Sequence, residues 1–130
     1  MSPEIVIIDV FEDERGELYE PVMGEDLLSG NVRNVHVITI MPGKVRGNHY
    51  HLRQTESICM GPNVAIHTIE NGERKRYRST GAGRVIVRVT PNIPHAIVNE
   101  GDDIEYVVCS SDVPHDPEEP DRIMQVVVTG

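Results

Sequence analysis

The segment GNHYHLRQTE, residues 47–56, carries two histidines and a carboxylate in a short span. Alternate residues of a β-strand point to the same face, so His49 and His51 are expected to lie side by side. Glu56 stands at odd spacing from both histidines and could not share their face on one unbroken strand. We therefore predict that residues 52–55 turn and that Glu56 begins the next strand, beside the histidine pair.

A third imidazole comes from the distant segment PNIPHAIVN, residues 91–99, where His95 opens an expected strand. Three imidazole nitrogens and one carboxylate oxygen, without a thiolate, suit a divalent transition metal such as Zn, Fe, Mn, Ni or Co, and do not select one. The alternative for Glu56 is a surface ion pair with Arg46 or Arg53, which contributes little stability. The pattern favours a metal site of His49, His51, Glu56 and His95.

The rest of the chain is a series of short runs rich in β-branched residues, separated by turns. The expected strands cover residues 4–10, 34–40, 57–60, 63–69, 84–89, 95–99, 104–110 and 124–128. Asn71-Gly72 suits a type I′ hairpin turn, and only GEDLLSG, residues 24–30, offers a brief helical turn. The pattern predicts an all-β fold, an antiparallel sandwich or barrel.

Length and charge narrow the possible functions. A chain of 130 residues suits one compact domain, so we expect a single domain over residues 1–130. The net charge of −9 argues against a sequence-independent nucleic-acid binder. No secretory signal or apolar run of membrane length stands out, and the cytoplasm is the expected compartment. Cys59 and Cys109 form no motif, and both are expected to be buried and inert.

These motifs resemble those of the cupin superfamily. Its first motif is glycine, five residues, HxH, three or four residues, glutamate, six residues and glycine. Here it falls on Gly43, His49, His51 and Glu56, with Asn63 at the position of the last glycine. The resemblance implies a single-domain cupin, an antiparallel β-barrel or jelly roll, with its metal-binding motifs within residues 43–99.

The second cupin motif, P-x-G-x-x-H-x-x-x-N, begins here at Thr90 and ends at Asn99. Asn92 replaces its glycine, as Asn63 does in the first motif. Asparagine accepts the left-handed backbone region more readily than most residues, so the same local conformation is expected at both positions. We expect Asn99 to bond to backbone groups near the site.

A narrower likeness concerns enzymes of nucleotide sugars. VRGNHYH, residues 45–51, is similar to a segment of the C-terminal cupin domain of capsular-polysaccharide UDP-sugar epimerase/reductases, and SSDVPHDPEEPD, residues 110–121, to that domain's acidic end. DERGELYEPV, residues 13–22, resembles the opening of dTDP-sugar epimerases and ketoisomerases. The implied function is metal-dependent epimerisation or isomerisation of a nucleotide-linked keto sugar. No glycine-rich dinucleotide motif is present, so no NAD is expected.

Other cupin activities use the same ligand set and remain open from the sequence. They are a zinc-dependent polyketide cyclase, an Fe or Ni dioxygenase, and a ligand-binding cupin without turnover. A pocket without arginine and with apolar walls would favour the cyclase.

Several further residues are candidates for the site. Glu56 or Tyr106 could move the proton during isomerisation, because a histidine that gives its lone pair to a metal cannot. Arg46 and Arg53 flank the histidine pair and are expected to bind the substrate's charged groups. His36 or His67 could add a further metal ligand, although each is more often a core residue.

The ends of the chain bear on assembly. Terminal strands at residues 4–10 and 124–128 would expose sheet edges and apolar side chains if the domain stood alone. We therefore expect a homodimer with a small-molecule substrate and neither nucleic acid nor membrane as a partner.

Overall fold

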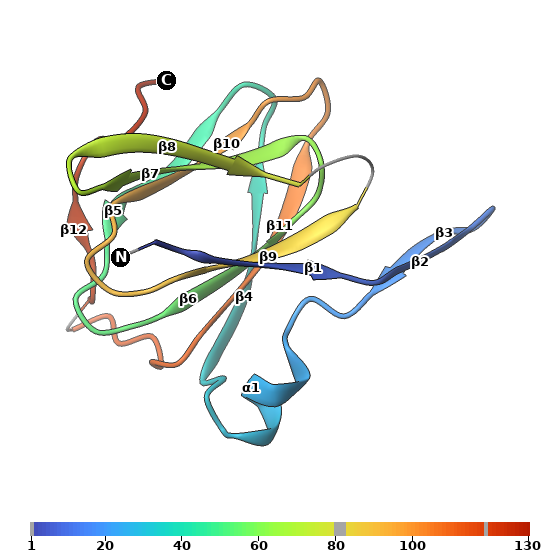
Figure 1. Ribbon diagram of the computed structural model, residues 1–130, viewed down its shortest axis with the longest axis horizontal. Coiled ribbons are helices and arrows are strands. Elements are labelled where there is room, and N and C mark those ends of the chain that lie inside the picture. Colours follow the sequence, from blue (N-terminus) through green and yellow to red (C-terminus); the bar gives the residue numbers. More distant parts are fainter. Residues whose placement is uncertain (1, 80–82, 119) are drawn as a thin grey trace.

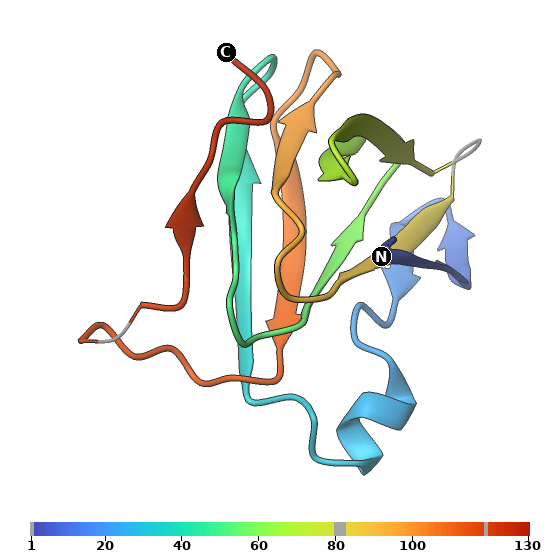
Figure 2. The same ribbon diagram turned by 60° about the vertical axis from the view of Figure 1, so that its left-hand side comes forward.

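The computed structural model describes residues 2–79, 83–118 and 120–130, which form two antiparallel sheets packed face to face (Figures 1 and 2). The first sheet has the order β1 (Glu4–Ile8), β9 (Arg84–Val89), β6 (Glu56–Met60), β11 (Glu105–Ser111) and β4 (Asn34–Ile40). The second has the order β12 (Ile123–Met124), β5 (Val45–Tyr50), β10 (His95–Asn99), β7 (Val64–Glu70) and β8 (Glu73–Arg78). The predicted all-β cupin sandwich is confirmed.

A hairpin and a short helix precede the first long strand. The hairpin of β2 (Val10–Asp13) and β3 (Gly16–Tyr19) projects from the body of the sandwich in Figure 1, and the helix α1 is Gly24–Leu28. The sequence anticipated the helix but not this hairpin. The expected strand 4–10 divides because Ile8 pairs with β9 whereas Val10 pairs with β3. In the described residues, no helix is both long and apolar enough to span a membrane.

The core lies between the two sheets. Ile58, Met60 and Val87 of the first sheet are fully buried, as are Val64 and Ile66 of the second. Burial of these aliphatic side chains, at about 25 cal/mol per Å² of apolar surface removed from water, holds the sheets together. The space between the two sheets is therefore filled by aliphatic side chains at its centre.

Two local predictions from the sequence can be compared with the backbone. Asn71 and Gly72 have φ angles of 52° and 79°, which confirms the type I′ turn between β7 and β8. Asn92 is left-handed at φ 69°, as expected. Asn63 is not, so that expectation is wrong: its carbonyl accepts the N–H of Glu100 at 2.8 Å in a turn that needs no positive φ.

The expected strand over residues 124–128 is also wrong beyond Met124. Val127 and Val128 donate their backbone N–H groups to the Asn48 side-chain oxygen at 2.8 and 3.0 Å, and Asn48 donates to the Val128 carbonyl at 2.9 Å. A side chain thus supplies the hydrogen bonds that a neighbouring strand would otherwise have supplied.

Candidate metal centre and pocket

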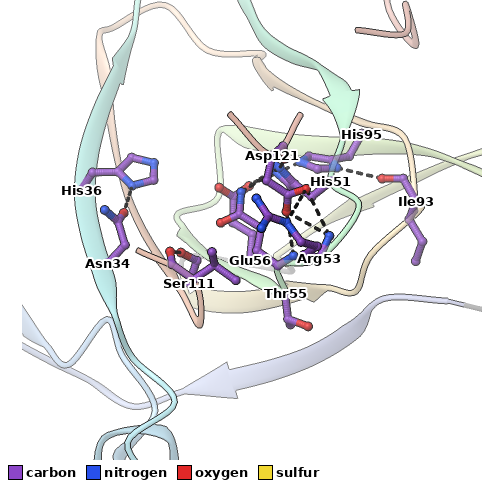
Figure 3. Close-up of polar contacts among 12 residues, drawn as sticks. Asn34, His36, His51, Arg53, Thr55, Glu56, Ile93, His95, Ser111 and Asp121 are labelled. Atoms are coloured by element: carbon purple, nitrogen blue, oxygen red, sulfur yellow. Dashed lines mark hydrogen bonds and ion pairs between the residues drawn. The ribbon is translucent and has the colours of Figure 1, made fainter. Parts of the chain in front are cut away.

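Four side chains converge at one end of the sandwich. His49 lies on β5 and His51 just beyond it, His95 opens β10, and Glu56 opens β6 of the opposite sheet (Figure 3 shows the last three). One ligand atom from each lies within 4.8 Å of the others. The turn before Glu56 and the approach of His95 are both as the sequence predicts. Strands from two sheets therefore hold the cluster.

A β-bulge aligns the histidines. His95 pairs with His49 and Ala96 with Gly47, which leaves Asn48 as the extra residue. Gly47 and Asn48 have φ angles of 96° and 56°, a region that favours glycine and asparagine. A Cβ on Gly47 would also lie 3.0 Å from the His95 carbonyl oxygen. The positive φ of Gly47 and its lack of a Cβ therefore allow the two strands to come close enough for His49 to face His95.

Asp121 holds the turn that follows His51. Its carboxylate accepts the backbone N–H groups of Leu52 at 3.0 Å and of Arg53 and Gln54 at 2.9 Å. Its carbonyl oxygen lies 2.5 Å from Nδ1 of His51. Burial by itself would raise the pKa of Asp121, but these N–H groups and Arg53 lower it. The C-terminal segment therefore fixes both the turn and one ring of the cluster.

The hydrogen bonds fix which ring nitrogens face the centre. Nδ1 of His95 lies 2.9 Å from the Ile93 carbonyl, and Nδ1 of His51 lies between the Asp121 carbonyl at 2.5 Å and the Gln54 side-chain amide at 2.7 Å. A carbonyl only accepts, so each Nδ1 donates its hydrogen there and each ring turns its Nε2 toward the cluster. Both Nε2 atoms are buried and have no hydrogen-bond partner among the residues that the structure describes. Buried, unpartnered ring nitrogens beside a carboxylate fit a divalent cation.

Charge at the cluster is consistent with this fit. Burial by itself would raise the pKa of Glu56, but the rings of His51 and His95, 3.9 and 3.3 Å from Oε1, lower it well below its usual range. Burial also lowers the pKa of His49 to about 4, with a further contribution from His95 and His51. His49 is therefore neutral and Glu56 anionic at physiological pH, as metal ligands require. Burial by itself would lower the pKa of His51, but Glu56 and the Asp121 carbonyl raise it, so a metal bound there would displace a proton from that ring.

A pocket of about 400 Å³ opens above the cluster, within the range of small-molecule sites. The segment after β11 forms one wall with Val113, Pro114 and His115, and Arg53 and Arg122 also line the pocket. Polar and charged side chains outnumber apolar ones in the lining. The pocket therefore brings two arginines together with the carboxylates of Glu56, Asp116 and Asp121.

Of the other residues predicted for the site, some line the pocket and some do not. His36 and Arg53 line the pocket. Tyr106 does not, because Val107 and Cys109 point into the core and Tyr106, 59% exposed, faces the other side of β11. A proton-transfer role for Tyr106 in this pocket is therefore not supported.

Arg46 and His67 also lie outside the pocket lining. The Nε of Arg46 donates to the Thr39 carbonyl at 2.8 Å, which links β5 to β4. His67 pairs with Ala96, the neighbour of His95, and so faces outward from the second sheet. Neither side chain is brought to the metal ligands.

The sequence reasoning missed Asp121, Arg122 and Asn48. The chain separates Asp121 from His51 by 70 positions, and no local pattern joins them. The only available signal was the likeness of the acidic segment 110–121 to the end of a capsular enzyme. Asn99 behaves as expected: its Nδ2 donates to the carbonyls of Ile40 at 2.9 Å and Asp103 at 2.7 Å.

Replacing Asp121 by alanine removes three hydrogen bonds to a charged acceptor and should lower the free energy of unfolding by about 1.5–3 kcal/mol. A lowered pKa stabilises the fold fully above the unfolded value and loses that contribution as pH falls through the folded value. The difference in the free energy of unfolding between the wild type and the variant should therefore shrink below about pH 4. Urea unfolding at several pH values measures it.

The control for this substitution is Asp102→Ala at an exposed bend. It should change stability by less than about 0.5 kcal/mol. Equal losses for the two variants, or a gap independent of pH, would contradict the role given to Asp121.

Comparison with known proteins places this geometry in a family. Residues 11–123 match the model described as the polysaccharide biosynthesis C-terminal domain. No curated protein matches the sequence.

Solved structures share the fold at low identity. The 3,4-ketoisomerase QdtA from Thermoanaerobacterium thermosaccharolyticum, with TDP-4-keto-6-deoxyglucose, is 17% identical with a TM-score of 0.71, covering 94% of this chain and 86% of that one. A dTDP sugar isomerase from Desulfovibrio desulfuricans is 14% identical with a TM-score of 0.74, covering 95% and 84%. The capsular polysaccharide assembling protein CapF from Staphylococcus aureus is 22% identical with a TM-score of 0.69, covering 92% of this chain but only 34% of CapF.

Proposed function

The chain belongs to the polysaccharide biosynthesis C-terminal domain family, and from this membership we propose that it is a metal-dependent isomerase or epimerase of a nucleotide-linked keto sugar. The observation that carries the proposal is the pair of buried, unpartnered Nε2 atoms of His51 and His95 at a pocket lined by two arginines. Structural neighbours that are a ketoisomerase and a sugar isomerase support the reaction class.

The residues that would hold the metal are His49, His51, Glu56 and His95. A divalent metal held there would polarise a substrate carbonyl and so acidify the adjacent C–H bond. The chain prepares this site by fixing its ligands before the substrate arrives. Asp121 and Ile93 orient two of the rings, and burial keeps the His49 lone pair free of a proton.

Glu56 is the group best placed to accept the substrate proton. It is the carboxylate of the cluster, and Oε1 faces His51 and His95, which leaves a second oxygen on the same group. We propose that this second oxygen takes the proton from the carbon beside the carbonyl and returns it to another face or atom. Burial by itself would raise the pKa of Glu56, but His51 and His95 lower it and so keep the carboxylate ionised until then.

Arg53 and Arg122 are proposed to bind the substrate's diphosphate. Both line the pocket, where Arg53 Nε lies 3.6 Å from the Asp121 carboxylate and Arg122 is the next residue of the chain after Asp121. Guanidinium groups bind phosphate oxygens through paired N–H donors. Two arginines at the pocket also count against the polyketide cyclase, for which an apolar lining was expected.

The test is binding and proton exchange with the metal-loaded protein. Calorimetry with dTDP- and UDP-linked 4-keto sugars should show binding that the same keto sugars without nucleotide do not show. In D₂O, NMR should detect deuterium entering the carbon beside the carbonyl. Failure of every nucleotide sugar to bind would remove the substrate assignment, and binding without exchange would favour a ligand-binding cupin.

The expected homodimer remains part of the proposal. Ile7 on the edge strand β1 is 80% exposed, and Phe11 and Leu18 on the projecting hairpin are 61% and 66% exposed. Apolar side chains gathered on an edge and an arm are covered when two copies pair.

A further inference from the structure

A second group of ligand-type side chains lies on the inner face of the first sheet. His36 of β4 pairs directly with Cys109 of β11, and Cys109 pairs with Ile58, two residues from Glu56 on β6. One ligand atom from each of His36, Glu56 and Cys109 lies within 4.8 Å of the others. We propose that these three side chains bind a second divalent metal ion, with Glu56 bridging it to the ion of the four-residue cluster.

The orientation of His36 suits this role. Its Nδ1 lies 2.8 Å from Oδ1 of Asn34, so the Nδ1 hydrogen is donated there and the Nε2 lone pair is left for a ligand. Figure 3 shows His36 on one side of Glu56, with His51 and His95 on the other. Glu56 thus stands between two sets of imidazole donors. A carboxylate has two oxygens, and Oε1 is the one that faces His51 and His95.

Cys109 supplies a donor that the first cluster lacks. Its side chain is 1% exposed and points into the sandwich, toward the pocket end where His36 lies. Thiolate, imidazole and carboxylate together suit Zn²⁺ or Co²⁺ better than Mg²⁺ or Mn²⁺. Adjacent strands hold the three donors. Burial, and then the nearby Glu56, raise the pKa of the Cys109 thiol, so binding of the ion must release the thiol proton to solvent. The sequence offered Cys109 no partner, whereas the fold offers it two.

The second ion changes the chemistry of the pocket. The inference rests on the proposed function in one respect, because both assign Glu56 a metal-binding role. An ion held by the second oxygen of Glu56 would prevent that oxygen from accepting a substrate proton. The occupied second position is therefore inhibitory, and turnover should fall when Zn²⁺ or Co²⁺ exceeds one equivalent.

Cobalt titration of the metal-free wild-type chain tests the proposal, because a thiolate bound to Co²⁺ gives a charge-transfer absorption in the near ultraviolet. Binding should stop at two Co²⁺ per chain, and this absorption should grow mainly with the second equivalent. Cys109→Ser should bind one Co²⁺ without the absorption. His36→Ala, at an exposed and therefore tolerant position, should weaken the second equivalent at least about tenfold, a loss of the size seen when a metal site's surroundings are altered.

Cys59→Ser is the matched control. Cys59 is also buried, on the neighbouring strand β6, but it pairs with Val108 and so faces the opposite side of the sheet from Cys109. This variant should still bind two Co²⁺ per chain and show the charge-transfer absorption. If the wild type binds only one Co²⁺ per chain, or if the absorption survives in Cys109→Ser, the second site is overturned. One Co²⁺ per chain leaves the proposed function intact, whereas no bound Co²⁺ removes the second site and the metal-dependent function together.

Discussion

Replacing His95 by alanine is expected to lower the affinity for Zn²⁺ or Co²⁺ at least about 100-fold, because the loss of a direct ligand should cost no less than the loss of an outer partner. His95 is 1% exposed, and its buried Nε2 has no hydrogen-bond partner among the described residues. Competition with a chelator measures the affinity, and elemental analysis after dialysis measures the metal retained. Far-ultraviolet circular dichroism should show that the sheets persist.

The control is His67→Ala. His67 lies on the neighbouring strand β7 and pairs with Ala96, so it faces outward, one position out of register with His95. Its removal should leave metal affinity unchanged. His49→Ala, at a half-buried ligand, repeats the test at a position where little packing is lost. Wild-type protein without a transition metal after reloading, or equal affinities for the His95 and His67 variants, would remove the metal centre.

Glu56→Gln is expected to reduce isomerisation by roughly 10²- to 10⁴-fold, the usual contribution of a positioned proton-transfer group. Glutamine keeps the size of the side chain and an oxygen that can still face His51 and His95, but it does not accept a proton. Deuterium entry into the keto sugar, followed by NMR, measures the step. The metal content of the variant, measured in parallel, separates lost proton transfer from a lost ligand.

Glu73→Gln, at an exposed position of β8, provides the control and should retain full exchange. If Glu56→Gln keeps wild-type exchange rates at full metal occupancy, another group moves the proton. In that case the inhibition expected from a second metal ion would also have no basis, although the ion's binding would stand on its own titration.

The sequence by itself determined what depends on neighbours along the chain. The spacing of His49 and His51 fixes that they share a face, and the odd spacing of Glu56 requires the intervening turn. Asn71-Gly72 and Asn92 carry backbone angles that few other residues accept, so their conformations could be predicted from residue type. The pairing of His49 and His51 and the turn before Glu56 could be predicted because short-range periodicity and turn chemistry depend on the local sequence.

Only the tertiary structure decided which face points inward and which strands become neighbours. The alternation of side chains along β11 predicts that Tyr106 and Cys109 lie on opposite faces of the sheet. Only the packing of the two sheets decides that Tyr106 faces solvent and Cys109 faces the core. The same choice of face turns His36 toward the pocket and His67 away from it. The bulge at Asn48 adds a shift that simple alternation cannot include.

Contacts between distant segments were equally beyond the sequence. Asp121 reaches the turn after His51 because β12 pairs with β5, and Cys109 meets His36 because β11 pairs with β4. Such pairings are selected by the burial of a whole apolar face, a property of both sheets together. Local sequence therefore specified the conformation of the segment that carries His49, His51 and Glu56, and the packing of the sandwich specified what surrounds these residues.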